Sequence, residues 1–240
     1  NSFYRVNVSK LYKKVVPYYI AQIYFIKGQY DKVIDYAMPL LKNPNFKYAL
    51  ETTYLVGKSY FNTEDYHEAL PYLRDYIKNA PKLIPTDIYN LGYSYYKVNN
   101  HTKAIKWLKQ ISDNKDSLSQ NANYIIANAF LAENKQRDAR AAFYKTKQIN
   151  EDASLTEVAA YNHAKMSYEL KLYEPAITDM TAFLDTYSES AYQKEGKELL
   201  SQMFIYTNNY QNAINVIESI EKPSPAVEEA YQRVCYLRAI

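Results

Sequence analysis

Small residues recur in this chain at spacings of 35 to 37 residues, and this recurrence restricts the possible folds more than any other feature of the sequence. One series has alanine in five of its six places: Val33, Ala69, Ala104, Ala139, Ala176 and Ala213. A second series, twelve residues earlier in each case, contains only alanine, glycine or serine: Ala21, Gly57, Gly92, Ala127, Ala164 and Ser201. A fixed period in this range is typical of chains built from repeated structural units.

The two series predict a repeated pair of antiparallel helices. Helices reach the short end of their usual separation, about 8 to 10 Å, only where small side chains meet at the crossing. Larger apolar residues lie beside the small ones and would fill the remaining space. They are Ile20, Val56, Leu91, Ile126 and Leu200 in the first helices and Leu73, Leu108, Phe143, Met180 and Ile217 in the second helices. In the fifth repeat His163 takes the apolar place, so its ring nitrogens must find partners or its pKa must shift.

Turn residues support the same hairpin. The place between the two helices is taken in turn by Gly28, Glu64, Asn99, Asn134, Lys171 and Asn208. Four of these six are glycine or asparagine, which adopt a positive φ at the least cost. Pro81 and Pro225 lie near the predicted ends of second helices and would end them by removing an amide donor. Pro39 and Pro71 fall within second helices and would bend them.

The pattern predicts an all-α chain with thirteen helices. Their expected ranges are 15–27, 30–42, 47–62, 66–78, 85–98, 101–111, 117–133, 136–148, 155–171, 173–186, 190–207, 210–220 and 225–239. Residues 1–14 are left without an assignment.

One segment carries a specific family resemblance. Residues Ile88–Ile111 read IYNLGYSYYKVNNHTKAIKWLKQI, which resembles the tetratricopeptide consensus with Gly92 at position 8 and Ala104 at position 20. The general resemblance covers nearly the whole chain from about residue 14. It implies a right-handed α-α superhelix, a tetratricopeptide solenoid of about six helical hairpins in a single domain over residues 1–240. The implied repeats are approximately 14–46, 47–84, 85–116, 117–153, 154–189 and 190–224.

A final helix at 225–240 would begin a seventh repeat. The chain also opens at Asn1 without a methionine. We therefore expect it to be part of a longer protein.

Composition argues against several functional classes. The net charge of +3 is spread evenly and lacks the basic stripe that phosphate binding requires, so no nucleic acid is expected. No apolar run approaches the roughly 18 residues of a membrane-spanning helix, so no membrane insertion is expected. The four glycines are too dispersed for a phosphate loop or a dinucleotide motif.

Metal and thiol chemistry is also unsupported. His67, His101 and His163 lie too far apart in the sequence for the close spacing of a zinc protease. Cys235 is the only cysteine, so neither an internal disulfide nor a thiolate cluster can form. We expect no enzymatic activity, no metal and no cofactor.

In tetratricopeptide proteins the first helices line a concave groove, and the resemblance implies that consensus positions 5, 9 and 12 point into it. Position 5 is tyrosine in five successive repeats. The candidate partner-binding residues at these positions are Tyr54, Lys58, Tyr89, Tyr93, Tyr96, Tyr124, Asn128, Tyr161, Lys165 and Tyr168. Rigid aromatic side chains with a polar tip are common anchors of protein interfaces. Tyrosine is also the consensus residue at positions 5 and 12, so the same side chains could instead pack between repeats.

The resemblance implies a non-catalytic protein-protein interaction scaffold that presents an aromatic groove to a peptide or protein partner. Co-chaperone members of the family bind a terminal carboxylate with a lysine at position 5. This chain has tyrosine there, which argues against that ligand. Two alternatives remain open: an RNA-binding helical repeat, and a structural or self-assembling spacer.

A second resemblance concerns the cellular location. Residues 182–195 read AFLDTYSESAYQKE, and the repeat spacings exceed the standard period of about 34 residues. Both features resemble those of tetratricopeptide proteins of the bacterial cell envelope, including outer-membrane assembly lipoproteins. This similarity implies a location in the envelope or periplasm, with the cytoplasm as the alternative. The oligomeric state stays unknown.

Overall fold

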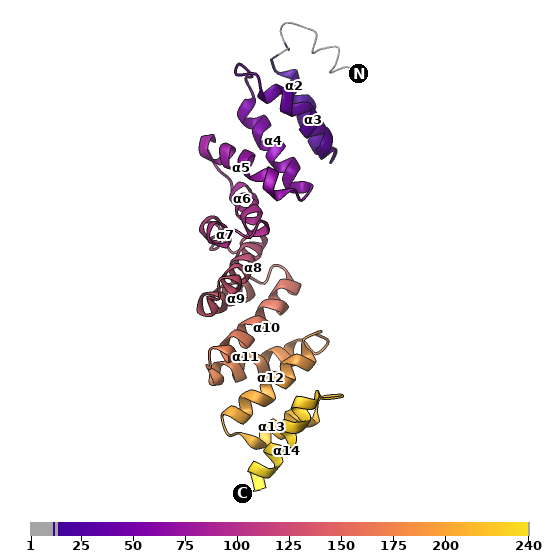
Figure 1. Ribbon diagram of the computed structural model, residues 1–240, viewed down its shortest axis with the longest axis vertical. Coiled ribbons are helices and arrows are strands. Elements are labelled where there is room, and N and C mark those ends of the chain that lie inside the picture. Colours follow the sequence, from indigo (N-terminus) through magenta and orange to yellow (C-terminus); the bar gives the residue numbers. More distant parts are fainter. Residues whose placement is uncertain (1–11, 13, 240) are drawn as a thin grey trace. The chain divides into compact units, whose positions relative to one another are not determined.

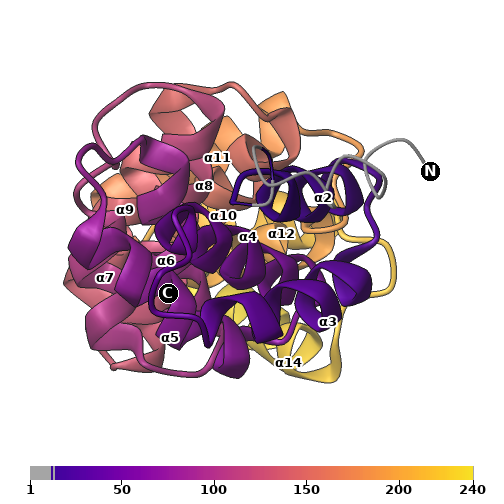
Figure 2. The same ribbon diagram turned by 90° about the horizontal axis from the view of Figure 1, so that it is seen from above.

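The computed structural model describes residue 12 and residues 14–239, and this part of the chain contains α-helices and no strand (Figures 1 and 2). The helices are α2 (Val16–Ile26), α3 (Tyr30–Leu41), α4 (Ala49–Asn62), α5 (Tyr66–Asn79), α6 (Pro85–Lys97), α7 (His101–Leu108), α8 (Ser117–Ala132), α9 (Gln136–Ile149), α10 (Ala153–Glu169), α11 (Tyr173–Thr186), α12 (Gln193–Tyr206), α13 (Tyr210–Glu218) and α14 (Pro225–Ala239). The predicted all-α fold is confirmed. Predictions for residues 1–11, residue 13 and Ile240 fall outside the described residues.

The chain divides into two compact units between Asp113 and Asn114. Unit 1 contains the hairpins α2/α3, α4/α5 and α6/α7, and unit 2 contains α8/α9, α10/α11 and α12/α13, followed by α14. Within each unit, every helix packs against the next one along the chain. The six predicted hairpins and the additional helix are therefore present. One continuous superhelix over residues 1–240 stays a prediction.

All but two helix boundaries lie within two residues of their predicted positions. Helix α7 ends at Leu108 instead of residue 111, because the backbone tightens into a turn in which the Ile111 N–H donates to the Leu108 carbonyl at 3.1 Å. That turn carries Ile111 into the core. Helix α12 begins at Gln193 instead of residue 190. The Gln193 side chain donates to the carbonyls of Leu184 and Tyr187, both at 2.8 Å, and so fixes the preceding turn.

The interpretation of Pro225 as a helix terminator was wrong. Helix α13 ends at Glu218, and Pro225 is the first residue of α14, where proline needs no amide donor. Pro81 follows the end of α5, as predicted. Helices α3 and α5 continue through Pro39 and Pro71, whose rings are exposed to solvent.

The small residues lie where the helices cross. All twelve members of the two series are buried, and the six in the second helices, from Val33 to Ala213, are completely inaccessible. The larger apolar residues next to them, such as Leu91 and Leu108, are equally buried. The sequence period therefore corresponds to a repeated close contact between paired helices.

The turn residues adopt the expected backbone conformation in every hairpin. All six have a positive φ, between 57° and 67°. Glu64 and Lys171 adopt it although neither residue type favours it, with φ of 62° and 61°. Since the left-handed conformation costs a residue with a side chain about 1 to 2 kcal/mol, the packing of the two helices must impose it there.

Replacing Lys171 with glycine is expected to stabilise unit 2 by about 0.5 to 1 kcal/mol. Glycine removes the strain of the positive φ, and its greater freedom in the unfolded chain offsets part of that gain. Urea unfolding followed by circular dichroism measures the change. Asn208→Gly is the matched control and should gain less, because asparagine already tolerates this conformation. Equal gains at both sites would contradict the strain argument.

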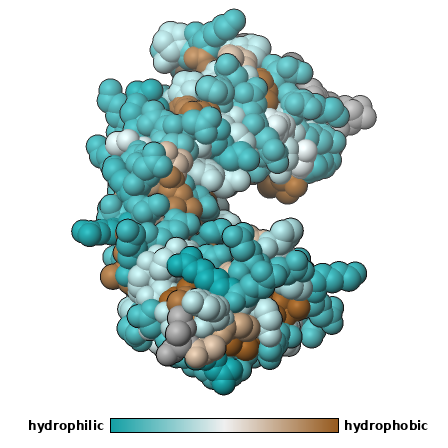
Figure 3. All heavy atoms as spheres, turned by 60° about the horizontal axis from the view of Figure 1, so that its bottom comes forward, coloured by the Kyte–Doolittle hydropathy of each residue, from teal (hydrophilic) through white to brown (hydrophobic). Residues whose placement is uncertain are grey.

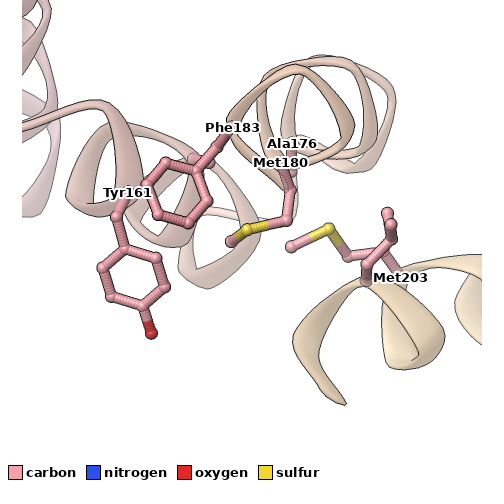
Figure 4. Close-up of a cluster of buried hydrophobic side chains, with 7 residues drawn as sticks. Tyr161, Ala176, Met180, Phe183 and Met203 are labelled. Atoms are coloured by element: carbon pink, nitrogen blue, oxygen red, sulfur yellow. The ribbon is translucent and has the colours of Figure 1, made fainter. Parts of the chain in front are cut away.

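The core of unit 2 shows how three helices meet (Figure 4). Tyr161 of α10, Ala176, Met180 and Phe183 of α11, and Met203 of α12 belong to one cluster, in which Met180 and Met203 face each other, and each is at most 2% exposed. The flexible thioethers fill the space between the helices. The small residue allows α11 to approach its neighbours, as the sequence pattern predicts.

Unit 2 also contains a buried amide that ties a loop to the helices. Gln120 of α8 is completely inaccessible. Its Nε2 donates to Thr156 Oγ1 at 3.0 Å and to the Asp152 carbonyl at 3.1 Å, while its Oε1 accepts from the Asp152 N–H at 2.6 Å. The side chain thus holds the α9–α10 connection in place, with its buried polar atoms satisfied.

Candidate functional site

Five aromatic side chains of unit 1 form one cluster, which we call the aromatic surface: Phe61 of α4, Tyr66 of α5, and Tyr89, Tyr93 and Tyr96 of α6. Tyr93 lies at its centre, with ring centroids 5.6 Å from Tyr66 and 5.7 Å from both Phe61 and Tyr89. Tyr96 is 6.4 Å from Tyr93. All five side chains are partly exposed. The cluster is therefore rigid and accessible at the same time.

One lysine borders these rings, and a second lies over Tyr54, outside the aromatic surface. Lys97 Nζ lies 5.5 Å from the ring centroid of Tyr66 and 5.9 Å from that of Tyr93. Lys58 Nζ lies 5.5 Å from the centroid of Tyr54. Ammonium groups at these distances interact favourably with the ring faces, and in the described part of the chain neither lysine forms an ion pair. Their charge remains available to a ligand.

Packing raises the pKa values of two tyrosine hydroxyls in this cluster. Burial, followed by the neighbouring tyrosines, raises the pKa of Tyr89 to about 12. Burial, followed by Tyr93 and then Glu64, raises the pKa of Tyr66 to about 12. Both hydroxyls are protonated at neutral pH, as those of ordinary tyrosines are, and the raised pKa values extend this state into alkaline solution.

Tyr54 has a structural role instead. Its hydroxyl donates to Asp87 Oδ1 at 2.6 Å, and its ring stacks on Tyr76 with centroids 4.2 Å apart. Asp87 is buried, and its other oxygen accepts the Ile84 N–H at 3.1 Å at the start of α6. Tyr54 thus joins two hairpins of unit 1, as the packing interpretation of the position 5 tyrosines predicts.

In unit 2 the candidate residues are more engaged in packing. Tyr161 is 2% exposed and stacks on Tyr192 at 4.4 Å, and burial, followed by Glu195, raises its pKa. Lys165 pairs with Glu195 at 2.9 Å. Tyr124 lies edge-on to Phe143. These side chains hold neighbouring helices together.

The remaining two unit 2 candidates differ from each other. The Asn128 Nδ2 donates to the Tyr124 carbonyl within the same helix at 3.0 Å. The Tyr168 hydroxyl donates to Gln202 Oε1 at 2.8 Å, and its ring lies beside Tyr173 and the exposed Tyr206. Tyr168 therefore belongs to a second, smaller group of accessible rings.

The candidate residues chosen from the sequence omitted five that the structure places in these groups: Phe61, Tyr66, Lys97, Tyr173 and Tyr206. Tyr66 and Tyr173 are first residues of second helices, where tyrosine also occurs in two other repeats. Lys97 lies one residue after Tyr96 and faces the rings. The recurrence of tyrosine at the start of the second helices was a usable signal for Tyr66 and Tyr173.

The described residues contain neither a metal-binding cluster nor a membrane-spanning helix. Within them no three histidine, cysteine, aspartate or glutamate side chains gather where they could hold a metal ion. None of the described helices combines the length and apolar character needed to cross a bilayer. The face drawn in Figure 3 is mostly hydrophilic with small separate hydrophobic patches. On that scale tyrosine counts as slightly hydrophilic, so rings such as those of the aromatic surface do not stand out by colour.

The geometry so far defines a helical-repeat protein with an aromatic, accessible face. Residues 51–82 and residues 88–113 each match a family model described as "Tetratricopeptide repeat". No curated protein matches the chain by sequence. Taken with the period, the buried crossings and the hairpins, the two matches show that the chain belongs to the tetratricopeptide-repeat family.

Solved structures share the fold at low sequence identity. YrrB, described as a tetratricopeptide protein with an unusual peptide-binding site, is 14% identical with a TM-score of 0.63, over 87% of this chain and 98% of YrrB. The C-terminal part of a repeat protein from Cytophaga hutchinsonii is 16% identical, with a TM-score of 0.61 over 84% and 76%. A tetratricopeptide protein from Parabacteroides merdae is 14% identical, with a TM-score of 0.55 over 93% and 87%. The fold is one that generally serves as a non-catalytic scaffold for protein-protein interaction.

Proposed function

We propose that the chain binds a peptide segment of a partner protein on the aromatic surface of unit 1. The observation that carries the proposal is the position of Tyr93, which is partly exposed and contacts four other rings. A ring held in this way loses little conformational entropy when a ligand covers it, which is the property of an interface anchor.

The polar groups around the rings define what such a peptide would offer. The hydroxyl of Tyr89 is protonated and can donate, and the ammonium group of Lys97, over the rings of Tyr66 and Tyr93, can donate as well. A peptide with apolar side chains and free carbonyl or carboxylate acceptors satisfies both requirements. The similarity of fold to YrrB, whose description names a peptide-binding site, supports this choice of ligand class.

The accessible rings of unit 2 extend the proposal. Tyr168 would contact a partner together with Tyr173 and Tyr206. Tyr161 and Lys165 would instead hold α10 against its neighbouring helix. We also propose that the protein acts in a bacterial envelope complex, on the strength of the sequence resemblance in residues 182–195. Fractionation of the native cells tests that location.

Changing Tyr89 and Tyr93 together to alanine is expected to weaken peptide binding by about tenfold to a hundredfold, because two central anchors are removed. Peptides are selected from a random display library on the unmodified chain, and their affinities are then measured by isothermal titration calorimetry. Tyr236→Ala, which removes a ring that is 69% exposed on α14, is the matched control and should leave affinity unchanged.

Three outcomes would contradict the proposal. The first is equal binding by the double variant and the control. The second is tight, strongly salt-dependent binding of single-stranded RNA, which would favour the RNA-binding alternative. The third is growth of light scattering with protein concentration and no selected peptide, which would favour a self-assembling spacer. Thermal unfolding of the double variant shows whether it remains folded.

A further inference from the structure

A cleft of about 580 Å³ opens in unit 1, lined by residues of α5, α6 and α7. Its walls are mainly apolar and include Pro71 and Ile77 of α5, Tyr95 of α6 and Trp107 of α7. None of these residues belongs to the aromatic surface. The volume lies within the usual range of ligand sites, about 300 to 1,000 Å³.

The cleft results from a difference in helix length. Helix α5 has 14 residues, whereas α7 has only 8 and turns into the core after Leu108. Both helices begin at equivalent places in their repeats, at Tyr66 and His101. The last six residues of α5 therefore have no counterpart in α7 to cover them. The charged residues of the cleft, at 74, 75 and 78, all belong to this uncovered end.

The charges at the rim favour an acidic ligand. Arg74 and Lys78 are exposed, one helical turn apart, and neither side chain forms an ion pair or a hydrogen bond within the described residues. The only acidic lining residue is Asp75, whose Oδ1 accepts from the Asn79 side chain at 2.9 Å. The rim is thus net positive around an apolar floor.

We infer that this cleft is a second binding site, which takes a short segment of another protein with a large apolar side chain flanked by acidic residues. The apolar side chain fills the space against Trp107 and Ile77, and the carboxylates lie beside Arg74 and Lys78. An open cleft along a helix accommodates a chain that continues at both ends. The site is separate from the aromatic surface, so one chain can hold two partner segments.

Trp107 makes the inference directly testable, because it is the only tryptophan in the chain and it lines the cleft. Its emission, excited where tyrosine does not absorb, is followed while blocked octapeptides are added. The first probe has acidic residues around a central leucine-phenylalanine pair. A second probe has lysines in place of the acids, and a third has serines in place of the apolar pair.

The acidic apolar probe is expected to shift the Trp107 emission saturably, and the other two are not. Arg74→Glu with Lys78→Glu should weaken its binding at least about tenfold, because the attraction becomes repulsion. Arg137→Glu with Lys194→Glu makes the same change of charge on exposed residues of unit 2 and should leave binding unchanged. The Tyr89→Ala and Tyr93→Ala variant should also bind this probe normally, which separates the cleft from the aromatic surface.

The inference is overturned if the lysine or serine probe binds as well as the acidic apolar one, if no probe binds, or if Arg74→Glu with Lys78→Glu has no effect. A shift of the emission with protein concentration alone would assign the cleft to a second copy of the chain and also overturn it. Should the double glutamate variant fail to fold, Arg74→Gln with Lys78→Gln removes the charges without reversing them and is judged by the same loss of binding.

Discussion

Replacing Gly92 with alanine is expected to destabilise unit 1 by about 1 to 3 kcal/mol. A Cβ added at Gly92 would lie 2.6 Å from Leu108 Cγ and 2.7 Å from its Cδ2, closer than non-bonded carbon atoms approach in proteins. Leu108 is completely buried, so it has no free space into which it can turn. Urea unfolding monitored by Trp107 fluorescence measures the loss within unit 1.

A double-mutant cycle tests the cause. Leu108→Ala alone is expected to cost about 2 to 5 kcal/mol through the cavity that it leaves. With both changes present, the new methyl group at residue 92 enters that cavity, so the combined loss should be smaller than the sum of the two single losses. Additive losses would show that the two residues do not compete for the same space. Gly28→Ala is a control for glycine substitution in general, since a Cβ there meets no atom within 4 Å and only its positive φ matters.

The same contact explains why the sequence predicts this fold so well. A crossing of two helices admits only small residues, so Gly92 and Ala104 are visible in the sequence as members of a fixed period. The ends of the first helices are also visible in the sequence. A positive φ, as at Asn99, is adopted easily by only a few residue types. Where the residue type did not fit, at Glu64 and Lys171, the period alone gave the correct place.

The candidate site was harder to predict, because its properties depend on contacts between repeats. Tyr54 and Tyr89 occupy the same consensus position, yet Tyr54 bonds to the buried Asp87 and Tyr89 stacks on Tyr93. The residues that decide the difference lie in the following repeat or elsewhere on the same helix. The cleft beside Trp107 was not predictable either, since it arises from the early end of α7. Gln120 likewise has no equivalent in the other repeats.

His163 shows how one departure from the pattern creates a distinct electrostatic cluster. Its ring is 3% exposed, and Nδ1 lies 3.1 Å from Asp179 Oδ2 of α11 and 3.3 Å from Lys147 Nζ of α9. Lys147 of α9 pairs with the other oxygen of Asp179 at 3.0 Å. Tyr144 of α9 lies beside the ring, with the two ring centroids 5.4 Å apart. Arg140 of α9 donates from Nε to Ser167 Oγ at 2.6 Å, and its charge also acts on His163.

The position of this ring is expected to make unit 2 sensitive to acid. Burial, then Lys147 and Arg140, lower the pKa of His163 to about 4, and the opposing effect of Asp179 is smaller than their sum. In the unfolded chain the pKa is about 6.5. As the pH falls from 6.5 to about 4, the unfolded state binds a proton that the folded state does not. The free energy of unfolding should therefore fall across this window, by roughly 2 to 3 kcal/mol, and this contribution should become constant below it.

His163→Leu isolates this effect from the titration of the carboxylates. The other five repeats carry isoleucine, valine or leucine at this place, so leucine fits the crossing. The ion pair of Lys147 with Asp179 remains, and only the titrating ring is lost. Urea unfolding followed by circular dichroism, at several pH values between 7 and 4, should show a smaller loss of stability for the variant than for the unmodified chain. A parallel decline of the two proteins would mean that His163 titrates alike in the folded and unfolded states, and that burial does not keep its ring neutral.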